Sequence, residues 1–165
     1  MAILAISGWS GAGKTTLIAS LIPLFKARGI GVSSIKHAHH GVTLDKPGKD
    51  SFIHAEAGAR EVILATDGGF ALFSHAETPL PLLVSRLSPV DLVLVEGFKS
   101  APMPRLAVYR PSLGKPAPWP DPHLLAVASD APLPDCPVPV LPLGAPPRIA
   151  DFLIRVLGLN GESHR

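Results

Sequence analysis

The sequence is poor in cysteine and has no long hydrophobic run. A single cysteine, Cys136, stands in 165 residues. One thiol cannot form an internal disulfide, so we expect a reducing, cytoplasmic setting. No apolar run reaches the roughly 18 residues that a membrane-spanning helix requires. The apolar start lacks the basic segment of a secretory signal and leads straight into a glycine-rich loop. These features predict a cytoplasmic protein that is neither exported nor anchored in a membrane.

Charged and aromatic residues are also scarce, at 17% and 5% of the chain. The net charge is only +2, and the basic residues are scattered rather than grouped. Nucleic-acid binding needs a basic surface and aromatic platforms, so we expect no nucleic-acid partner. The apolar share of 47% is enough for a globular core. We predict one nucleotide-binding domain over residues 1–158 and a flexible tail over 159–165.

Strand and helix patterns alternate along the chain. Apolar runs predict strands at 2–7, 30–35, 92–95, 106–109, 124–128 and 138–141, and a further pair at 61–65 and 70–73. Helical periodicity or capping signals predict helices at 14–28, 51–59, 79–87 and 149–157, with Ser51 as the cap of the second. Continuous apolar strands separated by helices are typical of an α/β fold with a mostly parallel central sheet flanked by helices in three layers. Five prolines in Pro111–Pro122 predict an extended surface loop.

A phosphate-binding motif follows the first predicted strand. The residues GWSGAGKT, from Gly8 to Thr15, match G-x-x-x-x-G-K-[ST] between a strand and a helix, the context that this motif needs. Its glycines let backbone N–H groups turn toward phosphate oxygens at a helix N-terminus. We expect Lys14 to reach the β- and γ-phosphates as a catalytic residue, and the Thr15 hydroxyl to bind Mg²⁺. The predicted nucleotide contacts are Gly8, Ser10, Gly11, Ala12, Gly13, Lys14, Thr15 and Thr16.

An acidic residue, Glu96, ends the apolar strand at 92–95. A carboxylate in this place can hold Mg²⁺ directly or through water, so we predict Glu96 as the second catalytic and metal-binding residue. Asp91 precedes the same strand and is expected to have a capping or turn role. Gly97 would let the chain approach the nucleotide closely. The alternative is that Glu96 is simply a solvated acid at a strand end.

Two loop segments carry further candidates. Lys36 and His37 follow the second strand and could hydrogen-bond phosphates; the histidines at 37, 39 and 40 could instead bind metal, or the loop could be merely exposed. In the segment DKPGKDS, Asp45 is predicted to serve Mg²⁺ or orient water, and Lys49 to receive an anion. A solvated charged loop is the alternative for this segment.

Asp130 ends a late strand and is a candidate for base recognition. A carboxylate accepts two hydrogen bonds from the N1–H and N2–H₂ groups of guanine, which adenine cannot supply. That would favour GTP over ATP. The alternative is a turn residue before Ala131-Pro132. The arginines are scattered, and we expect no arginine finger near the motifs, which is consistent with slow hydrolysis.

Together, GWSGAGKTTL, IKHAHH, DKPGKDS, AEAGA and DLVLVEGFK resemble the molybdopterin-guanine dinucleotide biosynthesis adaptor family, MobB. The phosphate motif is shared with many proteins, whereas the histidine segment followed by GKDS and VEGFK is more specific. The resemblance implies a P-loop NTPase-like fold, GTP with Mg²⁺ as ligands, a homodimer and at most slow GTP hydrolysis. It also implies partnership with the guanylyltransferase that attaches GMP to molybdopterin. Molybdopterin itself is a further candidate partner under this resemblance.

Two other functions are compatible with the same residues. A P-loop small-molecule kinase would use Lys14, Thr15 and Glu96, with residues 36–50 gripping the acceptor. The scattered arginines provide no arginine-rich lid for it. A scaffold with a vestigial phosphate loop is the third alternative, against which the intact Lys14 and Thr15 argue.

Overall fold

The computed structural model describes residues 1–38, 45–74, 76, 78–98 and 100–161. The chain forms two compact units, one containing residues 1–37 and 83–165 and the other residues 38–82. We call the first the sheet unit and the second the hairpin unit. Helix α3 (Leu80–Ser85) lies where the chain passes from the hairpin unit back into the sheet unit.

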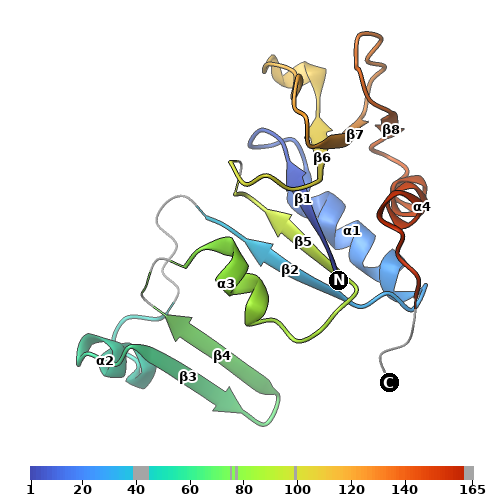
Figure 1. Ribbon diagram of the computed structural model, residues 1–165. Helices are drawn as coiled ribbons and strands as arrows, with labels where there is room; N and C mark the ends of the chain where they lie inside the picture. The colour runs from blue at the N-terminus through green and yellow to red at the C-terminus, as the bar shows by residue number, and fades with distance from the viewer. Residues whose placement is uncertain (39–44, 75, 77, 99, 162–165) are drawn as a thin grey trace. The chain divides into compact units, whose positions relative to one another are not determined.

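The sheet unit is built on six parallel strands (Figure 1). Their order across the sheet is β2-β5-β1-β6-β7-β8. The strands are β1 (Ala2–Ser7), β2 (Val32–Lys36), β5 (Leu92–Glu96), β6 (Arg105–Tyr109), β7 (Leu124–Ser129) and β8 (Val140–Pro142). The first four residues of β5 are fully shielded from solvent, as expected for a strand covered on both faces. The α/β fold with a parallel central sheet predicted from the sequence is confirmed.

Helices α1 (Lys14–Lys26) and α4 (Pro146–Leu157) pack against each other and enter the main core together. α1 buries Leu17, Ile18, Leu21 and Phe25, which recur at helical spacing. Pro23 lies inside α1, and the helix continues past it because the Ala27 N–H donates to the Pro23 carbonyl at 2.9 Å. α4 begins at Pro146, where a missing N–H costs nothing.

The other side of β6 and β7 is covered by loops. Ala107, Leu124 and Val127 form a smaller buried cluster. Tyr109, Trp119 and Leu133 are among the half-buried side chains that pack on it. Trp119 comes from the proline-rich segment, which begins with the short 3₁₀ helix η1 (Pro111–Leu113). At the C-terminal end, Leu159 is buried in the main core although the predicted tail begins at residue 159; residues 162–165 lie outside the described part.

The hairpin unit consists of α2 (Asp50–Glu56) and the antiparallel strands β3 (Glu61–Thr66) and β4 (Gly69–Ser74). Ser51 is not the helix cap, contrary to the sequence prediction. Lys49 occupies the N-cap position, and Ser51 is buried inside the first turn. Ser51 is therefore a shielded residue of the helix rather than its cap.

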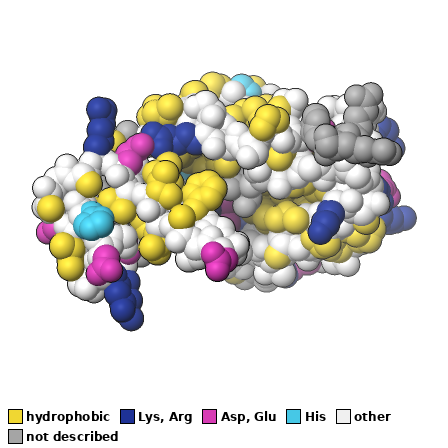
Figure 2. All heavy atoms as spheres, turned by 90° about the horizontal axis from the view of Figure 1, so that it is seen from below, with side chains coloured by type: hydrophobic (Ala, Val, Ile, Leu, Met, Phe, Trp, Pro, Cys, Tyr) yellow, Lys and Arg dark blue, Asp and Glu magenta, His cyan; other side chains and the backbone are white. Residues whose placement is uncertain are grey.

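One face of the β3–β4 hairpin is apolar and open to solvent. The register places Ile63 opposite Leu72 and Ala65 opposite Phe70. Successive side chains alternate between faces, so these four residues share one face. Ile63 is 63% exposed and Phe70 is 76% exposed. The space-filling view shows hydrophobic side chains gathered on the surface of the hairpin unit, at the left (Figure 2).

Candidate nucleotide-binding site

The phosphate loop connects the end of β1 to the start of α1, at the carboxyl edge of the sheet (Figure 1). Gly8 begins this loop with φ of 138°, and a Cβ there would lie 2.3 Å from the Val108 carbonyl oxygen of the neighbouring strand. Only glycine fits at this position. Gly13 ends the loop as the N-cap of α1 with φ of 100°. The backbone therefore turns sharply into a helix N-terminus, whose free N–H groups and partial positive charge suit a phosphate.

Lys14 is the first residue of α1 and folds back over the loop. Its Nζ donates to the Trp9 carbonyl oxygen at 3.1 Å. The first turn of α1 contains no acidic residue that would repel an anion. The ammonium group consequently lies beside the loop backbone that would surround a phosphate.

Thr15 and Glu96 face each other across the edge of the sheet. The Thr15 hydroxyl lies 3.3 Å from Glu96 Oε1 and 3.2 Å from Oε2. Lys36 Nζ approaches Glu96 Oε2 to 3.7 Å from the other side. The Glu96 side chain is only 13% exposed, whereas that of Lys36 is 61% exposed. Two hard oxygen donors and a cation thus converge in front of α1.

Strand register explains this convergence. β1 pairs with β5 so that Ile6 lies opposite Glu96, and β2 pairs with β5 so that Lys36 lies opposite Glu96. The next residue, Gly97, has φ of 105°, and a Cβ there would lie 2.7 Å from the His37 Cβ. Gly97 therefore allows the chain to pass close to His37, which directly follows β2. The expectation that Gly97 lets the chain approach a nucleotide stays a prediction.

His37 and Phe98 form a stacked pair beyond Glu96. Their ring centroids are 4.5 Å apart with an interplanar angle of 23°. Phe98 has a positive φ of 48°, an uncommon backbone conformation for a bulky residue. Such conformations concentrate at functional sites. The pair therefore belongs to the same edge as the predicted metal position.

Arg110 is the residue that sequence reasoning missed. It directly follows β6, and its Nε donates to the Ala12 carbonyl oxygen at 3.0 Å. Its Nη1 donates to Asp130 Oδ2 at 2.6 Å. The expectation that no arginine lies near the phosphate motif is wrong in space, although it holds along the chain. The available signal was its place directly after a strand, at the same edge as the loop.

The proline-rich segment is tied to the phosphate loop through Trp9. The indole Nε1 donates to the Pro116 carbonyl oxygen at 3.0 Å, and Lys115 Nζ lies 5.8 Å from the ring centroid. The Tyr109 hydroxyl donates to the Lys115 carbonyl oxygen at 3.1 Å. These contacts place the segment after β6 beside the loop.

The remaining predicted residues lie in the hairpin unit or outside the described residues. Asp45 and Lys49 belong to the hairpin unit, whose placement relative to Glu96 is not defined. Asp45 Oδ1 accepts the Lys46 N–H at 2.7 Å, and Lys49 is an exposed N-cap residue. His39 and His40 lie outside the described residues. Within the described ranges no cluster of three or more His, Cys, Asp or Glu side chains could hold a metal ion.

Comparison with known proteins places this arrangement in a family. The model of "Molybdopterin guanine dinucleotide synthesis protein B" (MobB) matches residues 3–130. The chain belongs to the MobB family. A molybdopterin-guanine dinucleotide biosynthesis adapter protein of Haemophilus influenzae is 45% identical over 157 residues, covering 92% of this chain and 86% of the relative. The Escherichia coli (strain K12) adapter protein is 42% identical over 160 residues, covering 92% and 91%.

A solved structure supports the same assignment. The crystal structure of molybdopterin-guanine biosynthesis protein B (mobB) superposes with a TM-score of 0.72 at 29% identity, covering 94% of this chain and 99% of that one. The MobB resemblance carried by the sequence motifs is thereby confirmed. The P-loop NTPase-like fold of this family is consistent with binding of a nucleotide and Mg²⁺.

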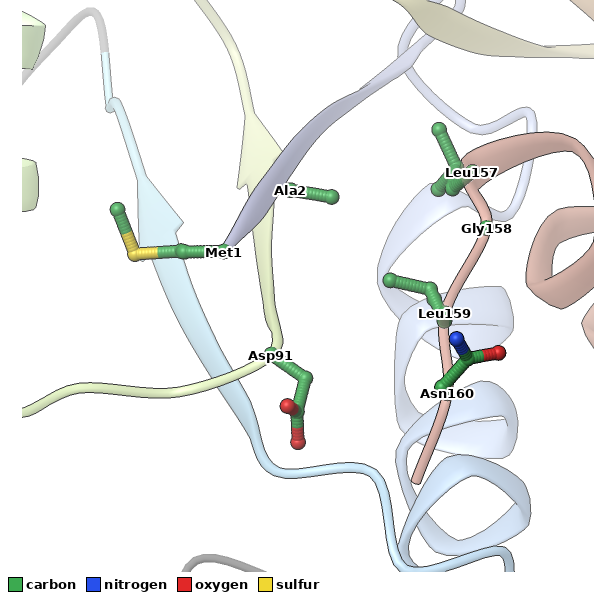
Figure 3. Close-up of a pocket in the computed structure, with 7 residues that line it drawn as sticks. All are labelled: Met1, Ala2, Asp91, Leu157, Gly158, Leu159 and Asn160. Atoms are coloured by element: carbon green, nitrogen blue, oxygen red, sulfur yellow. The ribbon is translucent and has the colours of Figure 1, made fainter. Parts of the chain in front are cut away.

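The opposite edge of this MobB-family sheet carries a pocket of about 370 Å³. Figure 3 shows its lining, which includes Ala2, Asp91 and Leu159. Asp91 Oδ2 accepts the Gly31 N–H at 2.7 Å, in agreement with the turn role expected from the sequence. Asp91 thus lies at the far end of β5 from Glu96.

In the described ranges, no helix is long and apolar enough to cross a membrane.

Proposed function

We propose that this protein is a GTP-binding adaptor in molybdopterin guanine dinucleotide synthesis. The observation that carries the proposal is the phosphate loop Gly8–Thr16 with Glu96 at 3.2 Å from the Thr15 hydroxyl. Membership of the MobB family and the names of its adapter relatives supply the pathway. In this proposal the protein acts in the cytoplasm on its partner, the guanylyltransferase that joins GMP to molybdopterin.

The triphosphate would lie on the loop and the first turn of α1. The N–H groups from Ser10 to Thr16 supply donors, and Lys14 moves its ammonium from the Trp9 carbonyl to the β- and γ-phosphates. Lys36 and His37 lie at the same edge and could receive the terminal phosphate. Lys49 belongs to the hairpin unit, and its predicted role as an anion receptor stays a prediction.

The residues present fit Mg²⁺. Mg²⁺ selects oxygen ligands at about 2.1 Å in octahedral geometry, so that neighbouring ligands lie about 3 Å apart. The oxygens of Thr15 and Glu96 are separated by 3.2 and 3.3 Å. Bound there, Mg²⁺ would neutralise phosphate charge. Asp45, the third ligand predicted from the sequence, belongs to the hairpin unit, and its role stays a prediction.

Asp130 is proposed to select guanine. β7 is two strands from β1 in the sheet, and Asp130 extends from its carboxyl end. Oδ2 already accepts one bond from Arg110. A carboxylate has about four acceptor positions, so guanine N1–H and N2–H₂ can still be accommodated.

A homodimer is proposed through the open face of the hairpin unit. Isolated two-stranded hairpins are marginally stable in water, and this one exposes Ile63, Phe70 and Leu72 on one face. A second copy of the same hairpin would cover an apolar face of this kind and supply the missing packing.

Calorimetric titration with GTP and with ATP, each with Mg²⁺, tests the proposal. GTP binding at least about tenfold tighter, or about 1.4 kcal/mol, is expected. Equal or tighter ATP binding, with phosphate transfer to a metabolite, would favour the P-loop kinase instead. Addition of the wild-type protein to a guanylyltransferase assay is expected to raise the yield of molybdopterin guanine dinucleotide. The Lys14→Ala variant is expected to raise this yield less.

A further inference from the structure

Arg110 stands between two parts of the site that the sequence separates. β6 and β7 pair in parallel with Tyr109 opposite Ser129, so that Arg110 and Asp130 are the next residues along neighbouring strands. On its other side β6 pairs with β1, which leads into the phosphate loop. The sheet order β1-β6-β7 thus places one arginine between the loop and Asp130.

Its guanidinium group contacts both neighbours at once. Nε donates to the Ala12 carbonyl oxygen at 3.0 Å, and Nη1 donates to Asp130 Oδ2 at 2.6 Å. A Cβ built on Gly13 would lie 3.6 Å from Arg110 Nη2, so the group also lies against the last residue of the loop. Bonds in two directions fix the orientation of a planar guanidinium, which a lysine ammonium could not reproduce.

Charge balance favours the same role. Asp130 without Arg110 would place an uncompensated negative charge on the edge that is to receive a triphosphate. The two side chains are each 37% exposed, so their attraction is only partly screened by solvent. With the pair formed, Asp130 retains free acceptor positions for a base while its charge is neutralised.

We propose that Arg110 is a positioning residue that couples the phosphate site to the base site, holding Asp130 in the orientation that accepts the guanine edge. This inference rests on the proposed function, in which Asp130 reads guanine. Arg110 thereby makes guanine preference dependent on the shape of the phosphate loop. A nucleotide that orders Ala12 and Gly13 also orders the base-reading carboxylate.

The test compares wild type, Arg110→Ala, Arg110→Lys and the matched control Arg148→Ala, an exposed arginine on α4. Each full-length variant is titrated calorimetrically with GTP, ATP and tripolyphosphate in Mg²⁺, and thermal unfolding verifies folding. Arg110→Ala is expected to weaken GTP binding about tenfold and ATP and tripolyphosphate binding by about threefold or less, which collapses the GTP-to-ATP ratio. Arg110→Lys is expected to behave like Arg110→Ala, and Arg148→Ala like wild type.

An Asp130→Ala background completes the cycle. Arg110→Ala should change the GTP-to-ATP ratio no further there, because the effect passes through Asp130. A preserved ratio in Arg110→Ala, an equal loss for all three ligands, or full rescue by lysine would overturn this inference alone. A wild-type protein that binds GTP no better than ATP would overturn the guanine assignment of the proposed function and the inference with it.

Discussion

The Thr15 hydroxyl and the Glu96 carboxylate lie 3.2 Å apart although 81 residues separate them in the chain. Parallel pairing of β1 with β5 brings both to one edge, because Ile6 lies opposite Glu96 and the phosphate loop follows β1 at Gly8. The relationship gives this edge a hydroxyl, a carboxylate and a helix N-terminus within one small volume.

Glu96→Gln should reduce the effect of Mg²⁺ on GTP binding. The amide keeps the size of the side chain but loses the negative charge that Mg²⁺ prefers. We expect Mg²⁺ to strengthen GTP binding about tenfold less in the variant than in wild type, measured by titration with Mg²⁺ and with EDTA. Asp135→Asn, at an exposed position, is the matched control. An unchanged Mg²⁺ effect in Glu96→Gln would remove Glu96 from the metal site.

Lys14→Ala should abolish most nucleotide binding without unfolding the protein. Lys14 Nζ donates to the Trp9 carbonyl oxygen of the exposed loop, and it reaches the phosphates in the proposed complex. A loss of at least about tenfold in GTP affinity is expected by calorimetry. Lys26→Ala removes the same charge at the other end of α1 and should bind as wild type. Full binding by Lys14→Ala would support the vestigial-loop scaffold.

Gly8→Ala should destabilise the fold. The new methyl group would meet the Val108 carbonyl oxygen at 2.3 Å, and φ of 138° is strained for any side chain. We expect a loss of roughly 2 kcal/mol or more in the free energy of unfolding, measured by urea denaturation. Gly144→Ala is the control because nothing lies within 4 Å of its added Cβ. Equal stability of the two variants would contradict the packing described here.

Phe70→Lys should separate the proposed dimer. Phe70 is 76% exposed on the apolar face of the hairpin unit, so a charge there costs little in a monomer and much in a covered interface. Light scattering after size exclusion is expected to give a dimer for wild type and a monomer for the variant. Val156→Lys, an exposed apolar position on α4, should remain dimeric. A monomeric wild type would refute the dimer.

Trp9 should report nucleotide binding by fluorescence. Its indole donates to the Pro116 carbonyl oxygen at 3.0 Å and stands inside the phosphate loop, so a bound triphosphate changes its surroundings. Trp119→Phe leaves Trp9 as the sole tryptophan and should retain an emission change with GTP. Trp9→Phe should lose that change while still binding in calorimetry. If the emission change with GTP came from Trp119 alone, the surroundings of the Trp9 indole would not change on binding, contrary to this prediction.

Much of this architecture was predictable because its signals are local. The predicted strand at 2–7 coincides with β1, and the Gly8–Thr16 motif lies between β1 and α1. The strand predicted at 92–95 ends one residue before β5 does, at Glu96. Strands buried on both faces of a parallel sheet appear in the sequence as continuous apolar runs, and the residues of a phosphate loop are consecutive in the chain.

Helix starts were less predictable. Ser51 is a favoured capping residue, yet the helix begins at Asp50 with Lys49 in the N-cap position and no side-chain cap. Burial of Ser51 in the hairpin unit outweighed the local preference for a cap. The capping preference of serine applies to a side chain exposed to water, whereas tertiary packing removes the Ser51 side chain from water.

The sequence by itself determined the phosphate loop, the parallel sheet, the acid at the end of β5 and the MobB resemblance, because each depends on neighbouring residues or on motifs in order. Only the tertiary structure decided that Arg110 joins Ala12 to Asp130 and that Lys36 lies beside Glu96. Those contacts follow from the strand order β2-β5-β1-β6-β7, which brings distant segments to one edge. Register between strands is set by packing of the whole core, and no short stretch of sequence contains it.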